Sequence, residues 1–362
     1  MKTNNSVVGA TFAVALLLVA SHSTFGQGTE NQNALLWRIS GNGLPKASYV
    51  YGTMHVSKKL AFHLGDPFFD ALEQSDAVAL ELDPAQWLKD MGTSKLFTMG
   101  VLESLGRGPG VRGFYDNAFN TDFPKREALL GVLAEEPYMI DDLLYRITDQ
   151  SGNSEELTYL DLFIFQAGRK LGKPVHGLER FDSSLELVML ANTEEGTKAD
   201  RERHRKRMAK YNDGPPLHEL LETAYRNGDL ARLDSLFDAE NVSSSSRKYM
   251  LDMRNDTMLN GMLPLMRNGS LFTAVGAAHL PGEGGILAKL RAMGYTVEAV
   301  PSAFTTASIQ RRHRYEEMYK PPVLTKVSGP DGDFSMDVPS QYYELPWGGN
   351  GRTLISTDPT NG

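Results

Sequence analysis

The amino-acid sequence predicts an α/β fold with a mostly parallel sheet, surrounding helices and a large helical insertion. Two observations support this class. Short, continuous apolar runs suit strands that are buried on both faces. They alternate with longer segments whose apolar residues recur at helical spacing, a pattern typical of α/β proteins. The 362 residues, 41% of them hydrophobic and 23% charged, provide enough apolar material for a large core.

The first 26 residues have the pattern of a cleavable signal peptide. Lys2 gives a short positive region, and Val7–Ala20 is an apolar run. Thr24–Gly26 then places small residues at the −3 and −1 positions before Gln27. A membrane anchor is the alternative, but the run is shorter than the roughly 20 residues of a spanning helix. We therefore expect a periplasmic or secreted protein without stable membrane insertion.

The first strands of the predicted sheet follow this segment. Leu35–Ser40 and Ala47–His55 are expected as two strands, because a Gly-Asn-Gly turn joins them. A helix is expected over Asp66–Gln74, since a proline occupies its first turn. Ala77–Leu82 is a continuous apolar run, so the sequence predicts a buried strand there.

Helical signals dominate the middle of the chain. Residues 84–172 end in an amphipathic helix that Gly172 terminates, and Lys173–Leu178 is a short strand. Residues 182–268 form the helical insertion. Its charged stretch, Glu194–Lys210, is expected as a solvated helix rather than a nucleic-acid patch.

The last strands and the tail complete the prediction. Leu271–Val275 and Tyr295–Val300 are expected as strands with a helix between them, which closes an α/β domain over residues 27–301. Residues 302–362 are expected as a charged linker and a polar, poorly structured Pro/Gly-rich tail, or as the start of a second domain. Phe334–Val338 resembles a strand that lacks an evident partner.

Composition excludes several classes of function. The formal net charge of −8 argues against a nucleic-acid partner, because phosphate binding needs a basic face. Cysteine is absent, which excludes disulfides, thiolate nucleophiles and cysteine-ligated metals. A bound metal would therefore use histidine, aspartate and glutamate ligands.

Four ionisable residues recur at strand ends. Gly-x-x-His closes two apolar strands, ending at His55 and His279, and Glu81 and Glu179 end two others. Ligands of open α/β sheets bind outside the carboxyl ends of the strands. The sequence thus predicts that these side chains converge at one rim as a metal or acid–base site. The alternative is that each has a separate structural role.

Arg254 has an unusual place in the sequence pattern. It shares the apolar face of a predicted helix with Leu251 and Met258. A guanidinium buried on that face needs a carboxylate partner or a bound anion, and Glu81 or Glu179 would serve. Alternatively, Arg254 reaches solvent at the helix edge.

These motifs, taken in order, resemble the TraB/PrgY/GumN family over about residues 34–301. The resemblance rests on Gly-Thr-Met-His ending at His55, Glu-Leu-Asp from Glu81, Gly-Leu-Glu ending at Glu179, Arg254-Asn255 and the run Val275–Gly285. It implies a fold similar to erythromycin-esterase-like and ChaN-like proteins. It also implies a relation to Tiki-type proteins, which look like metal-dependent peptidases acting on secreted signalling proteins.

The resemblance implies His55 and His279 as metal ligands and Glu81 as the strand-end acid. We therefore expect an exported metal-dependent hydrolase with a peptide or protein substrate and a divalent metal such as Zn, Mn or Co. One of Glu81 and Glu179 would complete the ligand set and the other would accept a proton from water. Arg254 would stabilise an oxyanion or hold a carboxylate.

Two other readings of the same residues stay open. In the first, an exported protein binds metal, haem or a small molecule without turning it over. In the second, the four strand-end residues form only an internal salt-bridge network in a catalytically silent scaffold.

Overall fold

The computed structural model describes most of the chain outside the amino terminus and one long internal segment. The described residues are 33–54, 61–86, 89–90, 93–94, 159–193, 196–212, 214–241, 243–329, 331–345, 353–356 and 358–361. The predicted signal peptide, most of the helical region expected over 84–172, and His55 lie outside them.

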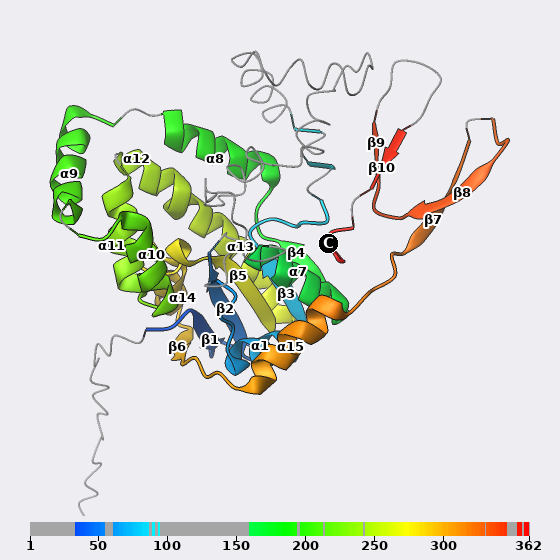
Figure 1. Ribbon diagram of the computed structural model, residues 1–362, viewed down its shortest axis with the longest axis horizontal. Coiled ribbons are helices and arrows are strands. Elements are labelled where there is room, and N and C mark those ends of the chain that lie inside the picture. The colour runs from blue at the N-terminus through cyan, green and yellow to red at the C-terminus, as the bar shows by residue number, and fades with distance from the viewer. Residues whose placement is uncertain are drawn as a thin grey trace, which may run out of the picture. The chain divides into compact units, whose positions relative to one another are not determined.

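A six-stranded sheet forms the centre of the described fold (Figure 1). Its strands are β1 (Leu36–Ser40), β2 (Ser48–Thr53), β3 (Ala77–Leu80), β4 (Val175–Gly177), β5 (Leu271–Gly276) and β6 (Thr296–Val300). They are ordered β4-β3-β5-β2-β1-β6. Only β1 runs against its neighbours, whereas β2, β5, β3 and β4 are paired in parallel. The predicted α/β class with a mostly parallel sheet is confirmed.

One face of the sheet is covered by α1 (Asp66–Gln74), α7 (Leu160–Lys170) and α15 (Thr306–Glu317). Phe68 of α1 packs edge-on against Tyr51 and Phe272, with ring centroids 4.9 and 5.4 Å away. Gly168 lets α7 approach closely, because a Cβ there would lie 2.9 Å from Val78. The helices thereby bury one side of β2, β3 and β5.

The opposite face carries α13 (Met253–Asn268) and α14 (Ile286–Ala292). Arg291 of α14 lies over the ring of Trp37, 5.3 Å from its centroid. Lys289 and Asp256 link α14 to α13 through an ion pair of 2.5 Å. Both faces of the central strands β2, β3 and β5 are therefore buried, as their continuous apolar sequences require.

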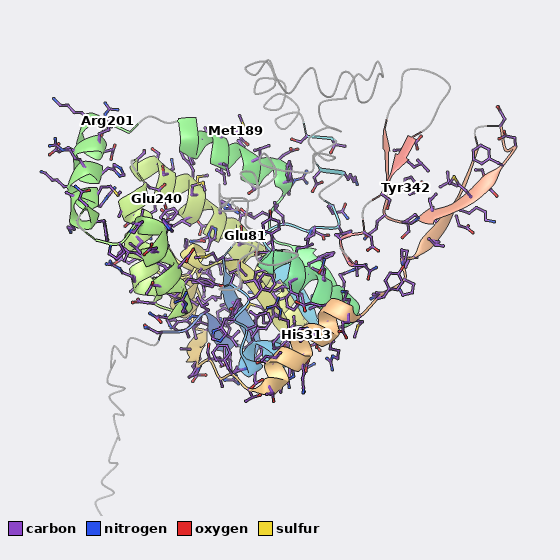
Figure 2. All side chains as sticks on the ribbon, viewed as in Figure 1. Glu81, Met189, Arg201, Glu240, His313 and Tyr342 are labelled. Carbon is purple, nitrogen blue, oxygen red and sulfur yellow. The ribbon has the colours of Figure 1, made fainter. Side chains whose placement is uncertain are left out.

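The predicted helical insertion lies between β4 and β5. It contains α8 (Phe181–Thr193), α9 (Lys198–Met208), α10 (Leu217–Arg226), α11 (Leu230–Glu240), α12 (Ser244–Arg247) and α13. Helix α9 carries the charged stretch: Arg201 is exposed at its start (Figure 2), and Arg205 pairs with Glu202 at 2.7 Å. The prediction of a solvated helix is confirmed there. None of the helices in the described part of the chain has the length and apolarity that crossing a membrane requires.

The chain beyond residue 301 returns to the core before it forms hairpins. Tyr315 of α15 is 1% exposed, stacks near Phe69 of α1 and donates its hydroxyl to Glu73 at 2.5 Å. Further on, β7 (Leu324–Ser328) pairs antiparallel with β8 (Ser335–Pro339), and β9 (Tyr343–Leu345) with β10 (Thr353–Ile355). The strand expected at 334–338 without an evident partner thus pairs with β7, a strand that the sequence pattern did not reveal.

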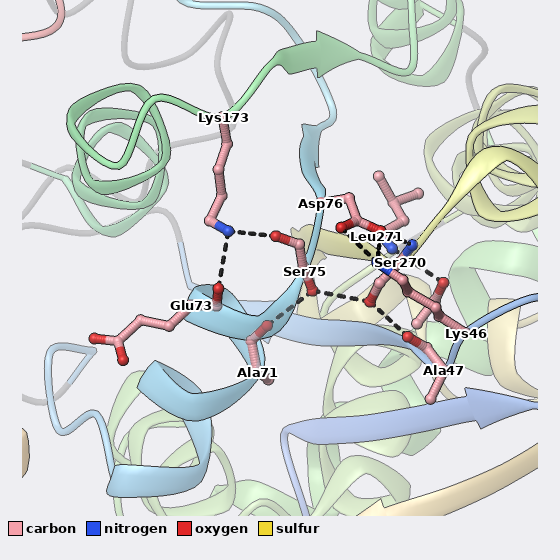
Figure 3. A network of polar contacts seen from close by, with 10 residues as sticks. Lys46, Ala47, Ala71, Glu73, Ser75, Asp76, Lys173, Ser270 and Leu271 are labelled. Atoms are coloured by element: carbon pink, nitrogen blue, oxygen red, sulfur yellow. Dashed lines mark hydrogen bonds and ion pairs between the residues drawn. The ribbon is translucent and has the colours of Figure 1, made fainter.

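Polar side chains tie together the amino ends of the strands (Figure 3). Lys173, just before β4, donates to the carbonyls of Glu73 and Ser75. Asp76, just before β3, accepts from the backbone N–H of Ser270 at 2.8 Å and from Lys46 at 2.8 Å. These contacts satisfy backbone groups where the helices and strands begin and end.

Candidate functional site

Residues from three adjacent strands meet at the carboxyl edge of the sheet. Glu81 directly follows β3 (Figure 2), Glu179 lies two residues beyond β4, and His279 ends a 3-10 turn after β5. Because β4, β3 and β5 are parallel neighbours, their carboxyl ends lie at one edge. The structure brings Glu81, Glu179 and His279 together there, with Arg254 from α13 between the carboxylates.

Arg254 binds both carboxylates that its sequence context suggested. Its Nε donates to the two oxygens of Glu179 at 3.1 and 3.0 Å. Its Nη2 donates to Glu179 Oε2 at 2.5 Å and to Glu81 Oε2 at 2.7 Å. The three side chains are 2–7% exposed. Arg254 is therefore buried and paired, and the alternative in which it reaches solvent is wrong.

The charges in this cluster are unequal. Two carboxylates face one guanidinium, so ionisation of both leaves excess negative charge in a buried place. Burial raises the pKa of Glu179, Arg254 lowers it less, and the neighbouring Glu81 charge raises it further. A cation would compensate this excess charge, either a proton or a metal ion.

The tautomer of His279 follows from its neighbours. Asn255 donates its Nδ2 to the carbonyl of Gly284 at 2.9 Å, which turns its Oδ1 toward His279 Nδ1 at 2.7 Å. Since Oδ1 only accepts hydrogen bonds, Nδ1 must carry the proton. In the neutral ring Nε2 is then the unprotonated nitrogen, the form that ligates metals.

His279 Nε2 faces a carboxylate oxygen. It lies 3.6 Å from Glu81 Oε1, which also accepts the backbone N–H of Gly276 at 2.6 Å. Zinc lies about 2.0–2.2 Å from nitrogen and carboxylate ligands, so atoms separated by this distance can bind one ion. The donor set fits a divalent metal with mixed N/O ligands.

The part of the chain that the structure describes contains no group of three or more His, Asp or Glu residues arranged to hold a metal. His55, the second predicted histidine ligand, is not among those residues. The assignment of His55, His279 and Glu81 as ligands remains a prediction.

A glycine-rich turn positions the backbone carbonyl that orients Asn255, the partner of His279. Gly284 contacts the carboxylate of Asp252 so closely that a Cβ would lie 2.6 Å from its Oδ1. At Gly285 a Cβ would lie 2.0 Å from the carbonyl oxygen of Pro281. Only glycine allows these approaches, which place the Gly284 carbonyl where Asn255 reaches it.

The segment that leads to His55 is held by residues that the sequence did not indicate. The Tyr225 hydroxyl of α10 donates a hydrogen bond to the carbonyl of Gly52 at 3.1 Å. It also accepts a hydrogen bond from the backbone N–H of Met54. Thr53 donates its hydroxyl to Asp161 of α7 at 2.8 Å. The sequence could not indicate Tyr225, because it lies 173 residues from Gly52 and an aromatic residue in an amphipathic helix is usually only part of the core.

The helix that carries Arg254 is irregular just before it. A π-helical segment, Lys248–Asp252, joins α12 to α13. Such segments are rare and occur frequently at functional sites.

Comparisons with known proteins agree with these motifs. A sequence model of the TraB/PrgY/gumN family matches residues 35–299. The chain is 24% identical over 326 residues to a protein named Metalloprotease TIKI2 from Danio rerio. The match covers 75% of this chain and 62% of that protein's length. No solved structure shows a significant match.

Proposed function

Because the chain belongs to the TraB/PrgY/gumN family, we propose that it is an exported metal-dependent hydrolase that cleaves peptide bonds. One observation carries the proposal: the buried pair of His279 Nε2 and Glu81 Oε1, 3.6 Å apart, beside a carboxylate that Arg254 holds in place. A relative named as a metalloprotease supports the same class of reaction.

In this proposal His279, Glu81 and His55 bind the metal, with Zn, Mn or Co as the suitable ions. When bound, the metal would polarise the substrate carbonyl and lower the pKa of water. Asn255 keeps Nε2 of His279 available by accepting a hydrogen bond from Nδ1–H, which holds the proton on Nδ1.

Glu179 is the group that we assign to proton transfer. Its raised pKa, caused mainly by burial, suits a carboxylate that accepts a proton from water and returns it to the leaving amine. Arg254 holds both carboxylates through its Nε and Nη2, which supports a positioning role. Both assignments require water and substrate to reach the carboxyl edge.

The experiment compares metal content and turnover in purified mature protein. We expect His279→Ala to lose metal by elemental analysis, while the exposed His218→Ala control keeps it. Glu179→Gln should retain metal and lose cleavage of a broad peptide library. Equal metal content in all variants would contradict the proposal.

The same variants separate the second reading, a protein that binds metal, haem or a small molecule without turnover. That reading predicts that Glu179→Gln leaves both ligand affinity and biological effect unchanged. A silent scaffold predicts that no variant changes metal content.

Export is part of the proposal and rests on residues 1–26. The mature chain would begin at Gln27. Mass spectrometry of the amino terminus after expression in a bacterium checks this. An uncleaved Met1 in the periplasmic fraction would contradict it.

A further inference from the structure

A second feature lies on the same edge of the sheet, over the other strands. A cavity of about 380 Å³ opens where β1 begins and where β2 and β6 end. This volume falls within the range of about 300–1,000 Å³ of small-molecule sites. Leu36 of β1 pairs with Tyr51 of β2 and with Val300 of β6, and all three residues line it.

The floor of the cavity consists largely of buried apolar and aromatic side chains. Leu36, Tyr51 and Phe68 are 3–5% exposed, and the Tyr51 and Phe68 rings pack edge to face. Tyr225 also lines the cavity, and its hydroxyl binds Gly52. This floor suits an aromatic or large aliphatic group.

The mouth of the cavity combines an aromatic wall with a cation. The rings of His63 and Phe304 are stacked, 3.8 Å apart and nearly parallel, although both residues are exposed. Arg226 lines the same opening. Within the described residues Arg226 makes no ion pair or hydrogen bond, and no Asp or Glu is among the lining residues. The mouth thus carries one positive charge without a carboxylate among its lining residues, in a protein of net charge −8.

The cavity lies close to the charged cluster. Thr53 pairs with Gly276, whose N–H binds Glu81, and Tyr51 precedes Thr53 by two residues. Two residues of a strand span roughly 7 Å. The cavity and the cluster therefore lie over neighbouring strands at one edge of the sheet.

We propose that this cavity binds the carboxyl-terminal residue of a peptide, with the carboxylate at Arg226 and an apolar side chain against Tyr51 and Phe68. The pairing of one unpartnered arginine with an apolar floor matches a carboxylate next to a large side chain. Binding of this peptide does not depend on the proposed hydrolase function. Only its role as a substrate rests on that function.

The test measures binding of three short peptides to the purified mature protein by isothermal titration calorimetry. The probes are N-acetyl-Gly-Gly-Phe with a free carboxylate, its carboxamide, and N-acetyl-Gly-Gly-Ala. Mass spectrometry of each sample reports any cleavage. We expect the carboxamide and the alanine peptide each to bind about tenfold more weakly than the first peptide.

Two variants locate the effect. Arg226→Ala should bind the acid and the carboxamide equally, and Phe304→Ala should weaken both. Arg232→Ala is the matched control, because Arg232 is an exposed arginine on α11 that does not line the cavity. It should leave the preference for the carboxylate unchanged.

The inference is overturned if wild-type protein binds acid and carboxamide equally, or if Arg232→Ala removes the preference as Arg226→Ala does. Its failure is distinct from that of the proposed function. Peptide cleavage that persists in a chain without carboxylate preference would overturn only the cavity assignment. A carboxylate preference in a chain that cleaves no peptide would overturn only the hydrolase.

Discussion

The two edges of the central sheet both carry polar clusters, and the clusters are built differently. At the amino edge, Lys173 and Asp76 mostly bind backbone groups (Figure 3). Lys46 and Asp76 there are 59% and 46% exposed. At the carboxyl edge, Arg254 binds the side chains of Glu81 and Glu179, and all three are 2–7% exposed.

This difference helps to distinguish polar side chains that stabilise the fold from those that could take part in a reaction. A side chain that binds backbone groups at a strand end supplies hydrogen bonds that every fold needs there. Buried charges that face one another cost desolvation and are seldom the most stable choice for a core. The carboxyl edge is therefore the one for which we propose a function, whereas the contacts at the amino edge support the fold.

The largest expected contrast comes from removing one cation at each edge. Arg254→Met leaves two buried carboxylates without their partner and should lower the free energy of unfolding by about 3–5 kcal/mol. Lys46→Met breaks an exposed pair and should cost about 0–1 kcal/mol. Urea unfolding measures both, and equal losses would remove the distinction between the edges.

A second contrast uses two buried tyrosine hydroxyls. Tyr225→Phe deprives Gly52 and Met54 of a partner, and Tyr315→Phe deprives Glu73 of one. Each should cost about 1–3 kcal/mol, because a buried group loses its hydrogen bond. Only Tyr225→Phe should also weaken metal binding, since it holds the segment that precedes His55. A loss of metal affinity in Tyr315→Phe would contradict this.

Asn255→Ala tests the tautomer argument. The variant removes the acceptor that keeps the proton of His279 on Nδ1. Metal affinity should fall by about 10–100-fold, the usual effect of losing a group that orients a ligand. Asn255→Asp keeps the acceptor and should restore part of the affinity. If both variants bind metal as wild type does, His279 is not oriented by this contact.

The smallest effect concerns acid stability at the amino edge. Lys46 and the N–H of Ser270 lower the pKa of Asp76 in the folded chain. Its contribution is therefore present above the unfolded pKa of about 3.9 and is lost as pH falls through the lower folded value. The difference in unfolding free energy between wild type and Asp76→Asn should stay below about 1 kcal/mol and shrink as the pH falls below about 4. A difference that grows on acidification would contradict the assignment.

Local sequence signals predicted the elements and the shared edge. The helix Asp66–Gln74 has the predicted bounds, and β3 begins at the predicted Ala77. The convergence of Glu81 and Glu179 followed from one rule, that parallel strands end at the same edge. The burial of Arg254 followed from helical periodicity.

Other parts of the site could not be read from the sequence. Strand order decides that β5 lies between β3 and β2, and a one-dimensional pattern does not contain that order. Tyr225 and Asp161 reach Gly52 and Thr53 across 173 and 108 residues, so no local spacing indicates them. The proton position on His279 depends on the orientation of Asn255, which only the carbonyl of Gly284 determines.

The π-helical segment before Arg254 decides which sides of the helix two arginines face. Arg247 and Arg254 are seven residues apart, and in a regular α-helix they would differ in direction by only about 20°. Here Arg247 pairs with Asp234 and Asp238 of α11, while Arg254 reaches the sheet. The wider π-helical turn therefore separates the directions of the two arginines, which regular winding over the same seven residues would align. A substitution that favours regular winding within Lys248–Asp252 would thus cost one arginine its ion pairs without altering either arginine itself.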